Sequence, residues 1–419
     1  MKKIVIEGGT PLRGEITVSG AKNAVLPLIA SSLLADGVSR ICEAPWLADV
    51  NTMCQVLEHL GIQVGFTQDS NCLEIDTSTL NGIEPPGELV RKMRASFLLM
   101  GPLLARYGAA KMSLPGGCAI GSRPIDLHLK GLEAMGAHFN IGHGYIDAQA
   151  QRLRGNRIYL DFPSVGATEN LMMAATLAEG ATIIENAAEE PEIVDLANFL
   201  SAMGAKIKGA GTKVIRIEGV NHLQPVTHVV IPDRIEAGSY MLAAAATGGE
   251  MLICNVIDEH LKSVTAKLQE SGVEVIEGEE GILVRGPDAI NPVNIKTLPY
   301  PGFPTDMQAQ FMALLSVAKG SSIITETVFE NRFMHVAQLS LMAGDIRIEG
   351  HSAVINGVSR LKGARVEATD LRAGAAMIIA GLMAEGRTEI ENICHIERGY
   401  ANICQKFEQV GAKIKIVDD

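Results

Sequence analysis

The chain has 419 residues, enough for roughly two to four domains. Its 36 lysine and arginine residues against 48 aspartate and glutamate residues give a net charge of −12, which excludes nucleic acid and the anionic membrane surface as main partners. Hydrophobic residues make up 47% of the chain and aromatic residues only 4%, which indicates a folded protein with an aliphatic core.

No apolar stretch reaches the roughly 18 to 20 residues that span a bilayer, and residues 1–9 lack the pattern of a signal peptide. We therefore expect a cytoplasmic protein without membrane insertion. The seven cysteines include no C-x-x-C pair and, apart from Cys118, mostly lie in apolar contexts that favour reduced thiols of the core. The chain has no P-loop and no histidine cluster at metal-ligand spacing, so nucleoside triphosphate hydrolysis and zinc catalysis are not indicated.

A pattern of about seventy residues recurs six times along the chain. Each copy begins with a helical run that ends in glycine and leads into a short apolar strand. These first glycines are Gly37, Gly108, Gly180, Gly249, Gly320 and Gly386. A second helix follows, and it ends at Gly61, Gly136, Gly204, Gly272, Gly344 or Gly411. Each glycine suits the position after a helix, where a positive φ is common. The repeat therefore contains helix, strand, helix and strand, and a further strand links it to the next copy.

Six copies predict an α/β fold with two lobes of three repeats each. The boundary falls in residues 219–232, which contain Pro225 and little helical pattern. The first lobe then comprises residues 21–229. The second lobe comprises residues 230–419 together with residues 1–20, because an N-terminal strand would complete the last repeat of a closed three-fold lobe.

The first helices of the six repeats start with polar or charged residues. They are Lys22, Arg94, Ser164, Asp233, Asp306, and Asp370 with Arg372. Helix N-termini present unpaired N–H groups and the positive end of the helix dipole, so their convergence at the cleft between the lobes would form an anion-binding surface. Ordinary N-capping is the alternative for Asp233 and Asp370. Cations are disfavoured as caps, so the basic residues of this set point to ligand binding.

A glycine-rich loop in residues 114–124 has the sequence LPGGCAIGSRP, with Cys118 at its centre. A thiol near Arg123 and near helix N-termini is biased toward thiolate, which favours a reactive cysteine over a structural one. Two further stretches, ENRFMH at 330–335 and HIERGY at 395–400, place arginines at equivalent points of the fifth and sixth repeats. Surface ion pairs are the alternative for these two stretches.

Seven segments of the chain form a recognisable set. They are GAKNA at 20–24, MRAS at 93–96, LPGGCAIGSRPIDLH at 114–128, PSVGATEN at 163–170, PTDMQAQF at 304–311, ENRFMH at 330–335 and HIERGY at 395–400. Together they resemble the family of UDP-N-acetylglucosamine 1-carboxyvinyltransferases, the enolpyruvyl transferases of peptidoglycan synthesis. The resemblance covers essentially the whole chain, with the motifs in family order. It implies a two-lobed, inside-out α/β barrel of six repeats, three per lobe, with the active site in the cleft between the lobes.

The resemblance also implies a reaction. The family transfers the enolpyruvyl group of phosphoenolpyruvate to the 3′-hydroxyl of UDP-N-acetylglucosamine by addition and elimination, with release of phosphate, in the first committed step of peptidoglycan precursor synthesis. That step serves cell wall biogenesis, cell shape and cell division. No metal or organic cofactor is implied. The implied partners are the two small-molecule substrates and fosfomycin, an epoxide that alkylates the family's loop cysteine.

Roles carry over residue by residue from the resemblance. Cys118 would protonate the methylene carbon or form a covalent pyruvate adduct, and Asp306 would take the proton of the sugar hydroxyl, with Lys22 and Arg398 as further catalytic residues. The phosphoenolpyruvate-binding set is Lys22, Asn23, Arg123, Arg332, Arg372 and Arg398. The UDP-sugar-binding set is Arg94, Arg123, Pro124, Ile125, Asp126, Leu127, Ser164, Val165, Gly166, Asp306 and Val328. Some members carry a lysine where this chain has Phe162, so that position is not expected to be a polar contact of UDP.

Two alternative functions remain to be weighed. The shikimate-pathway enolpyruvyl transferase shares the repeats and the phosphoenolpyruvate chemistry, but it lacks the cysteine loop and the PSVGATEN segment. A catalytically silent, UDP-sugar-binding regulatory paralogue is disfavoured by the joint presence of Cys118, Asp306, Lys22, Arg123 and Arg398.

Overall fold

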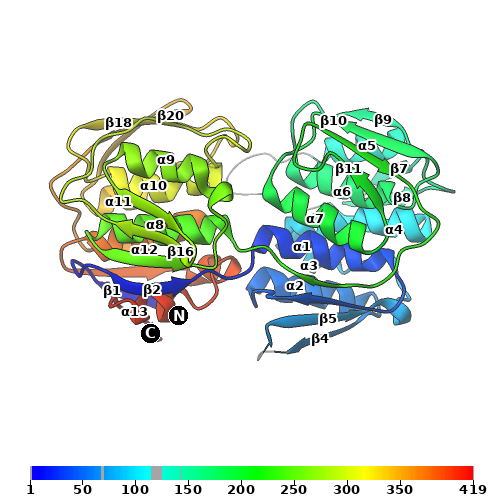
Figure 1. Cartoon of the computed structure of the whole chain (residues 1–419), viewed down its shortest axis with the longest axis horizontal. Helices are drawn as coiled ribbons and strands as arrows, with labels where there is room; N and C mark the ends of the chain where they lie inside the picture. Colours follow the sequence, from blue (N-terminus) through cyan, green and yellow to red (C-terminus); the bar gives the residue numbers. More distant parts are fainter. Residues whose placement is uncertain (1, 68–69, 115–124, 143, 419) are drawn as a thin grey trace. The chain divides into compact units, whose positions relative to one another are not determined.

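The computed structural model describes residues 2–67, 70–114, 125–142 and 144–418 (Figure 1). These residues divide into two compact units, the first lobe within residues 20–231 and the second lobe made of residues 2–19 and 232–418. Across the described ranges, no helix combines the length and apolar character that crossing a bilayer requires.

In the first lobe, each repeat contains a first helix, a strand, a second helix and a two-stranded hairpin. Its helices are α1(Lys22–Ser31), η1(Ser32–Leu34), α2(Ala48–His59), η3(Thr77–Thr79), α3(Gly87–Lys92), η4(Arg94–Leu99), α4(Met100–Tyr107), α5(Asp126–Ala134), α6(Val165–Ala175) and α7(Pro191–Ala202), where η marks a 3₁₀ helix. Its strands are β3(Val38–Cys42), β4(Gln63–Thr67), β5(Cys72–Asp76), β6(Ala109–Ser113), β7(His138–Gly142), β8(Tyr145–Gln149), β9(Arg157–Tyr159), β10(Ala181–Glu185), β11(Lys206–Lys208), β12(Val214–Glu218) and β13(Thr227–Val229).

The second lobe repeats this order. Its helices are α8(Arg234–Ala246), η5(Asp258–Leu261), α9(Lys262–Glu270), η6(Thr305–Met307), α10(Gln308–Leu315), α11(His335–Leu341), α12(Leu371–Met383), η7(Ile393–Arg398) and α13(Ile403–Gln409). Its strands are β1(Lys2–Glu7), β2(Arg13–Thr17), β14(Glu250–Cys254), β15(Glu274–Gly278), β16(Gly281–Arg285), β17(Ile295–Lys296), β18(Ser321–Thr325), β19(Asp345–Glu349), β20(Ser352–Asn356), β21(Arg365–Glu367), β22(Arg387–Glu391) and β23(Lys413–Asp418).

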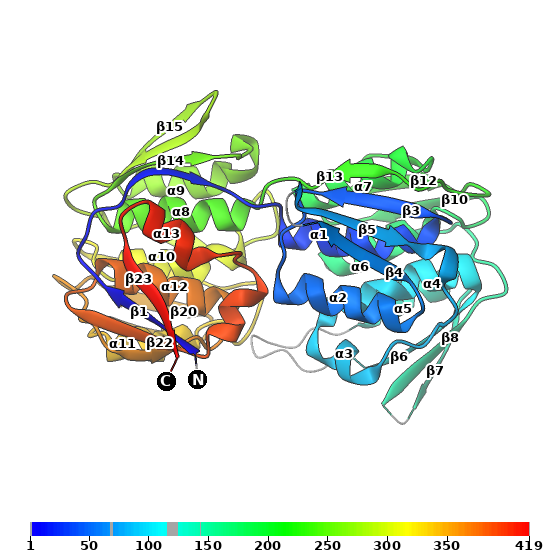
Figure 2. The same ribbon diagram turned by 90° about the horizontal axis from the view of Figure 1, so that it is seen from below.

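Each repeat forms one small sheet, and a linking strand completes five of the six sheets. The sheet of the second repeat has only β6, β8 and β7 among the described residues. In the third repeat, β9 pairs in parallel with β10, while β12 pairs antiparallel with both β10 and β11. The linking strand β13 returns to pair with β3 of the first repeat, so the first lobe closes on itself. In the second lobe, β2 completes the sheet of β14, and β1 lies between β22 and β23. Figure 2 shows β1 beside β23, with the two chain ends close together.

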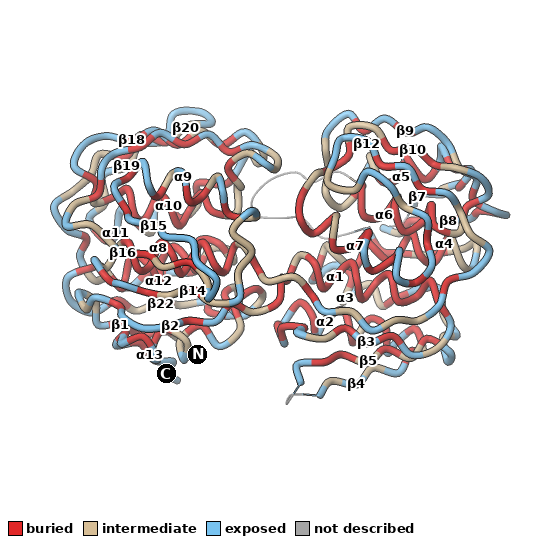
Figure 3. The backbone as a smooth tube through the Cα atoms, in the orientation of Figure 1, coloured by how far each residue is buried: buried red, intermediate tan, exposed pale blue. Residues whose placement is uncertain are grey.

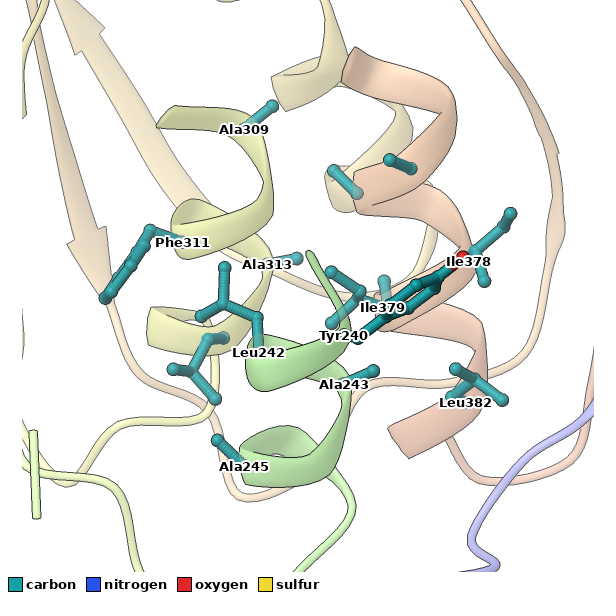
Figure 4. Close-up of a cluster of buried hydrophobic side chains, with 14 of the residues drawn as sticks. Tyr240, Leu242, Ala243, Ala245, Ala309, Phe311, Ala313, Ile378, Ile379 and Leu382 are labelled. Atoms are coloured by element: carbon teal, nitrogen blue, oxygen red, sulfur yellow. The ribbon is translucent and has the colours of Figure 1, made fainter. Parts of the chain in front are cut away.

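Helices fill the centre of each lobe, and the sheets cover them. The tube in Figure 3 is buried mainly along the central helices and exposed along the outer strands. In the second lobe α8, α10 and α12 pack against one another. Figure 4 shows the cluster that they form, with Tyr240 and Leu242 from α8, Phe311 from α10, and Ile378 and Ile379 from α12. Almost every residue of these three helices is buried, as expected for helices enclosed by other elements.

The predicted α/β class, with helices inside and sheets outside, is confirmed. The strands of the described residues form six separate open sheets, three in each lobe, and none of these sheets closes into a barrel by itself.

The predicted positive φ occurs at all but two of the glycines that end the helices. The exceptions are Gly249 and Gly344, where the preceding residues Gly248 (φ 60°) and Ala343 (φ 69°) take the left-handed conformation instead. Gly249 is required for another reason, because a Cβ atom there would lie 2.2 Å from the carbonyl oxygen of Leu12. The glycine pattern therefore marks the turn after each helix, although α6 and α10 end at Ala175 and Leu315, well before Gly180 and Gly320. It also misplaces the left-handed residue by one position in two repeats.

The expectation of reduced core cysteines is wrong for one pair. Cys42 in β3 and Cys72 in β5 form a disulfide, with their Cα atoms 4.1 Å apart. The two strands are antiparallel and adjacent, and the register places these residues opposite each other. Cys54 is a buried free cysteine, whereas Cys394 is exposed. The apolar context of each cysteine could not reveal the pair, because the partners are 30 residues apart and strand register brings them together.

Candidate active site

Three residues predicted to face the substrates form one ion-pair cluster in the second lobe. Asp306 lies in η6, Arg332 precedes α11, and Arg372 lies in the first turn of α12. Asp306 Oδ1 is 2.7 Å from Arg332 Nη2, and its Oδ2 is 2.8 Å from Arg372 Nη2. The arginine side chains are 5% and 4% exposed, whereas the Asp306 side chain is 26% exposed. The carboxylate is therefore the accessible part of a cluster whose cations are buried.

The two arginines control the protonation of this carboxylate. Burial raises the pKa of Asp306, but the charges of Arg372 and Arg332 and their hydrogen bonds outweigh it and hold this pKa well below its usual value. Burial lowers the pKa of Arg372, and the charge of Asp306 more than reverses this effect. The cluster therefore holds an aspartate anion and an arginine cation across the neutral pH range. An anionic ligand that shares the arginines would raise the pKa of Asp306 and make it a better base.

A second set of hydrogen bonds holds Arg372 in place. Its Nη1 atom is 3.5 Å from the hydroxyl of Tyr400, which is 2.8 Å from Ser239 Oγ. Gln310 Nε2 is 3.4 Å from the same hydroxyl and donates to the backbone oxygen of Asp306 at 2.9 Å. The guanidinium and the carboxylate are thus positioned by shared partners.

Arg398 lies at the same end of α12 as Arg372. It is the half-buried last residue of η7, which packs against α12. The next residue is Gly399, where a Cβ atom would lie only 2.6 Å from Leu371 Cδ2. A larger residue there would displace the Leu371 side chain, so η7 lies close against the start of α12.

Asp233 and Asp370 are N-caps. This confirms the alternative interpretation of these two residues, ordinary helix capping. Asp233 Oδ1 accepts hydrogen bonds from the backbone N–H groups of Ile235 and Glu236 at 2.8 and 3.0 Å. Asp370 Oδ1 accepts from Arg372 N and Ala373 N at the same distances. Their side chains are accounted for by capping.

In the first lobe, Lys22 is the first residue of α1 and is buried against an acidic partner. Its Nζ atom is 2.7 Å from Oδ2 of Asp49, and the two side chains are 10% and 7% exposed. Asp49 lies in the first turn of α2. An ammonium group that is buried and paired in this way has its position fixed before any ligand binds. Asn23, the next residue of α1, is half-buried.

The starts of α5 and α6 lie side by side in the same lobe. A Cβ atom at Gly166 would be 3.4 Å from the ring of His128, and a Cβ atom at Gly131 would be 2.6 Å from Leu171. Burial, and then the charge of Arg94, lower the pKa of His128 to about 3, so the ring is neutral at physiological pH. The structure therefore brings Arg94 close to the two helix starts that carry the other predicted UDP-sugar residues.

The remaining predicted residues of this set differ in exposure. Ile125, Leu127, Ser164, Val165, Gly166 and, in the second lobe, Val328 are half-buried, whereas Asp126 is exposed. Ser164 also caps α6 by accepting from Ala167 N at 3.3 Å. Phe162 is 43% exposed. Cys118, Arg123 and Pro124 lie outside the described residues.

Sequence reasoning missed three residues that support the site. Asp49 pairs with Lys22, and its place in a first helical turn looks like an ordinary helix-dipole contact. Asn170 accepts from Gly101 N at 2.6 Å and lies 3.0 Å from the ring of His128. Glu326 directly follows β18 and is 1% exposed. A buried carboxylate after a strand has no sequence signal beyond its charge. Among the described residues, no group of three or more histidine, cysteine, aspartate or glutamate residues is arranged to hold a metal ion.

Comparison with known proteins first gives the fold class. The structure is similar to the enolpyruvyl transferase NikO from Streptomyces tendae, with a TM-score of 0.88 and 24% identity over 99% of both chains. It is also similar to the EPSP synthase from Acinetobacter baumannii, with a TM-score of 0.76 and 19% identity over the full length of both chains. The shared feature is the fold of the enolpyruvyl transferases.

The chain belongs to the EPSP synthase (3-phosphoshikimate 1-carboxyvinyltransferase) family, which it matches over residues 6–407. It is 62% identical to the UDP-N-acetylglucosamine 1-carboxyvinyltransferase 2 of Carboxydothermus hydrogenoformans over 100% of both chains. It is 59% identical to the UDP-N-acetylglucosamine 1-carboxyvinyltransferase 1 of Caldanaerobacter subterraneus, over 98% of this chain and 99% of the relative. The predicted family is confirmed, and the chain is a transferase.

Proposed function

We propose that this protein transfers the enolpyruvyl group of phosphoenolpyruvate to the 3′-hydroxyl of UDP-N-acetylglucosamine and releases phosphate. The observation that carries the proposal is the identity of 59 to 62% along almost the whole chain to relatives named for this activity. The reaction begins peptidoglycan precursor synthesis. Because phosphoenolpyruvate is an intermediate of cytoplasmic metabolism, the proposal places the protein in the cytoplasm.

Addition to phosphoenolpyruvate requires a base and an acid. The sugar hydroxyl loses its proton as its oxygen bonds to the central carbon of phosphoenolpyruvate, and the methylene carbon gains a proton to become a methyl group. Elimination then breaks the bond to phosphate and returns a proton from the methyl group to the solvent or to the protein. We assign the base to Asp306, which is ionised and accessible between its two arginines. We assign the acid, or a covalent adduct, to Cys118.

Phosphoenolpyruvate carries a phosphate and a carboxylate, so its binding needs several cations. The proposal gives this role to Lys22, Arg123, Arg332, Arg372 and Arg398, with Asn23. The pairs with Asp49 and Asp306 hold Lys22, Arg332 and Arg372 in fixed geometry. When the substrate binds the arginines it competes with Asp306 for their charge, which raises the pKa of the base as the reactant arrives.

The UDP-sugar is assigned to residues of both lobes. In the first lobe these are Arg94, Arg123, Pro124, Ile125, Asp126, Leu127, Ser164, Val165 and Gly166, and in the second lobe they are Asp306 and Val328. The adjacency of the starts of α5 and α6 supports the first group, because it gathers backbone N–H groups and half-buried side chains next to Arg94.

A phosphate-release assay tests the proposal. Purified protein with phosphoenolpyruvate and UDP-N-acetylglucosamine is expected to release phosphate at a rate proportional to enzyme concentration. Release only with shikimate 3-phosphate as acceptor would make the chain a shikimate-pathway enzyme instead. UDP-sugar binding without phosphate release from either pair would make it a regulatory protein. Inhibition by fosfomycin, which depends on a reactive cysteine, is expected only in the first case.

A further inference from the structure

Glu326 is a buried carboxylate in the second lobe that none of the assigned roles uses. It directly follows β18, and it is 1% exposed. Its side chain lies between two segments, the one that carries Asp306 in η6 and the turn that carries Val328. It therefore connects the proposed base to a proposed UDP-sugar contact.

Four donors saturate this carboxylate. Oε1 accepts from Thr297 Oγ1 at 2.8 Å and from the backbone N–H groups of Val328 and Phe329 at 2.8 and 3.2 Å. Oε2 accepts from Thr305 Oγ1 at 2.8 Å. A carboxylate is the only neutral-pH side chain that offers acceptors alone on both of its oxygens, so it matches this set of donors.

The hydrogen bond from Thr305 fixes the polarity of its hydroxyl. Because the single hydroxyl hydrogen is given to Glu326, the remaining lone pairs accept from Nη1 of Arg332 at 3.3 Å. The neighbouring Nη2 atom then reaches Asp306 Oδ1 at 2.7 Å. The chain of contacts runs from Glu326 through Thr305 and Arg332 to the proposed base.

Glu326 also positions a second neighbour of Arg332, the ring of Phe329. Its guanidinium carbon lies 5.3 Å from the centre of the Phe329 ring, which suits a cation–π contact. The backbone N–H of Phe329 is one of the four donors to Glu326. Two of the neighbours of the guanidinium, the Thr305 hydroxyl and the Phe329 ring, are therefore positioned by one carboxylate.

We propose that Glu326 is a positioning residue that aligns the Arg332–Asp306 pair with the backbone of Val328, so that the base and the sugar contact keep a fixed spacing. This inference rests on the proposed function for the roles of Asp306 and Val328. Glu326 touches neither substrate, and it acts through Thr305 and the turn at residues 328–329.

Glutamine cannot replace Glu326 even though it has the same shape. If its amide oxygen faces the two backbone N–H groups, its NH₂ group faces Thr305, whose hydroxyl must then turn its hydrogen toward Arg332. If the amide is reversed, the NH₂ group opposes the two backbone N–H groups. Each orientation loses one of the two functions of the carboxylate.

Two variants separate these functions. Thr305→Val removes the hydroxyl that joins Glu326 Oε2 to Arg332 and leaves the three hydrogen bonds to Oε1 in place. We therefore expect kcat to fall roughly 10- to 100-fold while KM for the UDP-sugar stays within about threefold. Glu326→Gln is expected to lower kcat similarly if its NH₂ group faces Thr305, and to raise KM for the UDP-sugar if its NH₂ group faces the backbone N–H groups of Val328 and Phe329. Thr388→Val is the matched control, because it is the same change at a buried residue of the same lobe whose hydroxyl has no hydrogen-bond partner among the described residues.

The pH dependence distinguishes positioning from loss of structure. Arg332 lowers the pKa of Asp306, so a less well-positioned Arg332 should let that pKa rise. The fall of kcat/KM at low pH, where the base becomes protonated, should then begin at a higher pH in Thr305→Val. It should not shift in Thr388→Val. Each kcat is expressed per folded molecule, taken from thermal unfolding followed by circular dichroism. If folded Thr305→Val keeps both the wild-type kcat and the wild-type pH dependence of kcat/KM, the proposal is wrong. If Glu326→Gln does not fold, the measurements on Thr305→Val are sufficient to test the proposal.

A wrong proposed function can be distinguished from a wrong assignment of Glu326. If the proposed function is wrong, the wild type and Thr388→Val both fail to release phosphate. Acid unfolding still tests the positioning, because Asp306 contributes stability that is lost as pH falls through its folded pKa. Thr305→Val must then begin to unfold at a higher pH than Thr388→Val, and identical acid-unfolding curves would overturn the inference.

Discussion

Asp306 and Arg372 form an ion pair whose two ends lie in different surroundings. Their Oδ2 and Nη2 atoms are 2.8 Å apart, but the arginine side chain is 4% exposed and the aspartate side chain is 26% exposed. The arginine therefore depends on the aspartate to offset its desolvation, whereas the aspartate keeps access to a ligand. The proposed base therefore also serves as the structural partner of the cations around it.

The first prediction follows from that double role. Asp306→Asn preserves shape but removes the charge, so turnover is expected to fall roughly 10²- to 10⁴-fold because a positioned base is lost. The fold is expected to lose about 3 to 5 kcal/mol of unfolding free energy, because two buried arginines lose their anion. Steady-state kinetics and urea unfolding measure the two effects.

Asp345→Asn is the matched control, since Asp345 is an exposed residue of β19 in the same lobe. This variant is expected to keep both turnover and stability. Near-normal turnover in folded Asp306→Asn would remove Asp306 from the chemistry.

Much of the fold follows from the sequence because each repeat carries local signals that agree. Glycines mark the helix ends, and polar residues such as Ser164 and Asp370 mark the starts as N-caps. Arg332 and Arg372 were identified because cations are unusual near helix starts and because two arginine segments occupy equivalent points of adjacent repeats. The structure brings both arginines to Asp306.

The supporting contacts are not local, and the sequence does not contain them in readable form. Asp49 is 27 residues from Lys22, and Glu326 is 21 residues from Thr305. Each contact depends on how strands and helices pack in three dimensions. A carboxylate that accepts four hydrogen bonds and a carboxylate in solvent have the same letter in the sequence, so only the packing distinguishes Glu326 from a surface residue.

Cysteine reactivity gives the second prediction. Burial raises the pKa of Cys54 and of Cys404 to about 12, and it also raises the pKa of Cys254, so these thiols are poor nucleophiles at neutral pH. We therefore expect fosfomycin to alkylate Cys118, as mass mapping of the modified peptide would show.

The exposed Cys394 is the competing target, which makes it the useful control. Labelling is expected to persist in Cys394→Ser and to disappear in Cys118→Ser. The opposite result would transfer the reactivity to Cys394 and contradict the assignment of Cys118.

The third prediction concerns the cross-strand pair Cys42 and Cys72. Thiol titration in denaturant is expected to find two more thiols after reduction than before it, because the disulfide withholds two. The double variant Cys42→Ser/Cys72→Ser should show no such increase, and its unfolding free energy should be lower by about 2 to 4 kcal/mol. Cys54→Ser should retain the increase. An equal thiol count before and after reduction in the wild type would rule out the disulfide.

The last prediction concerns Glu169, a buried carboxyl in α6 with Glu192 and Glu190 as its acidic neighbours. Burial, and then the charges of these neighbours, hold the pKa of Glu169 well above its ordinary value of 4.5. As pH rises above that value the unfolded chain releases this proton while the folded chain keeps it, so the unfolding free energy falls by about 1.4 kcal/mol per pH unit until the folded pKa is reached. Glu169→Gln removes this contribution, so the variant should gain stability relative to the wild type as pH rises above 4.5. Glu133→Gln, at an exposed position of α5, should follow the wild type. Urea unfolding at several pH values measures the difference, and parallel stability curves for wild type and Glu169→Gln would show that the Glu169 pKa is not raised.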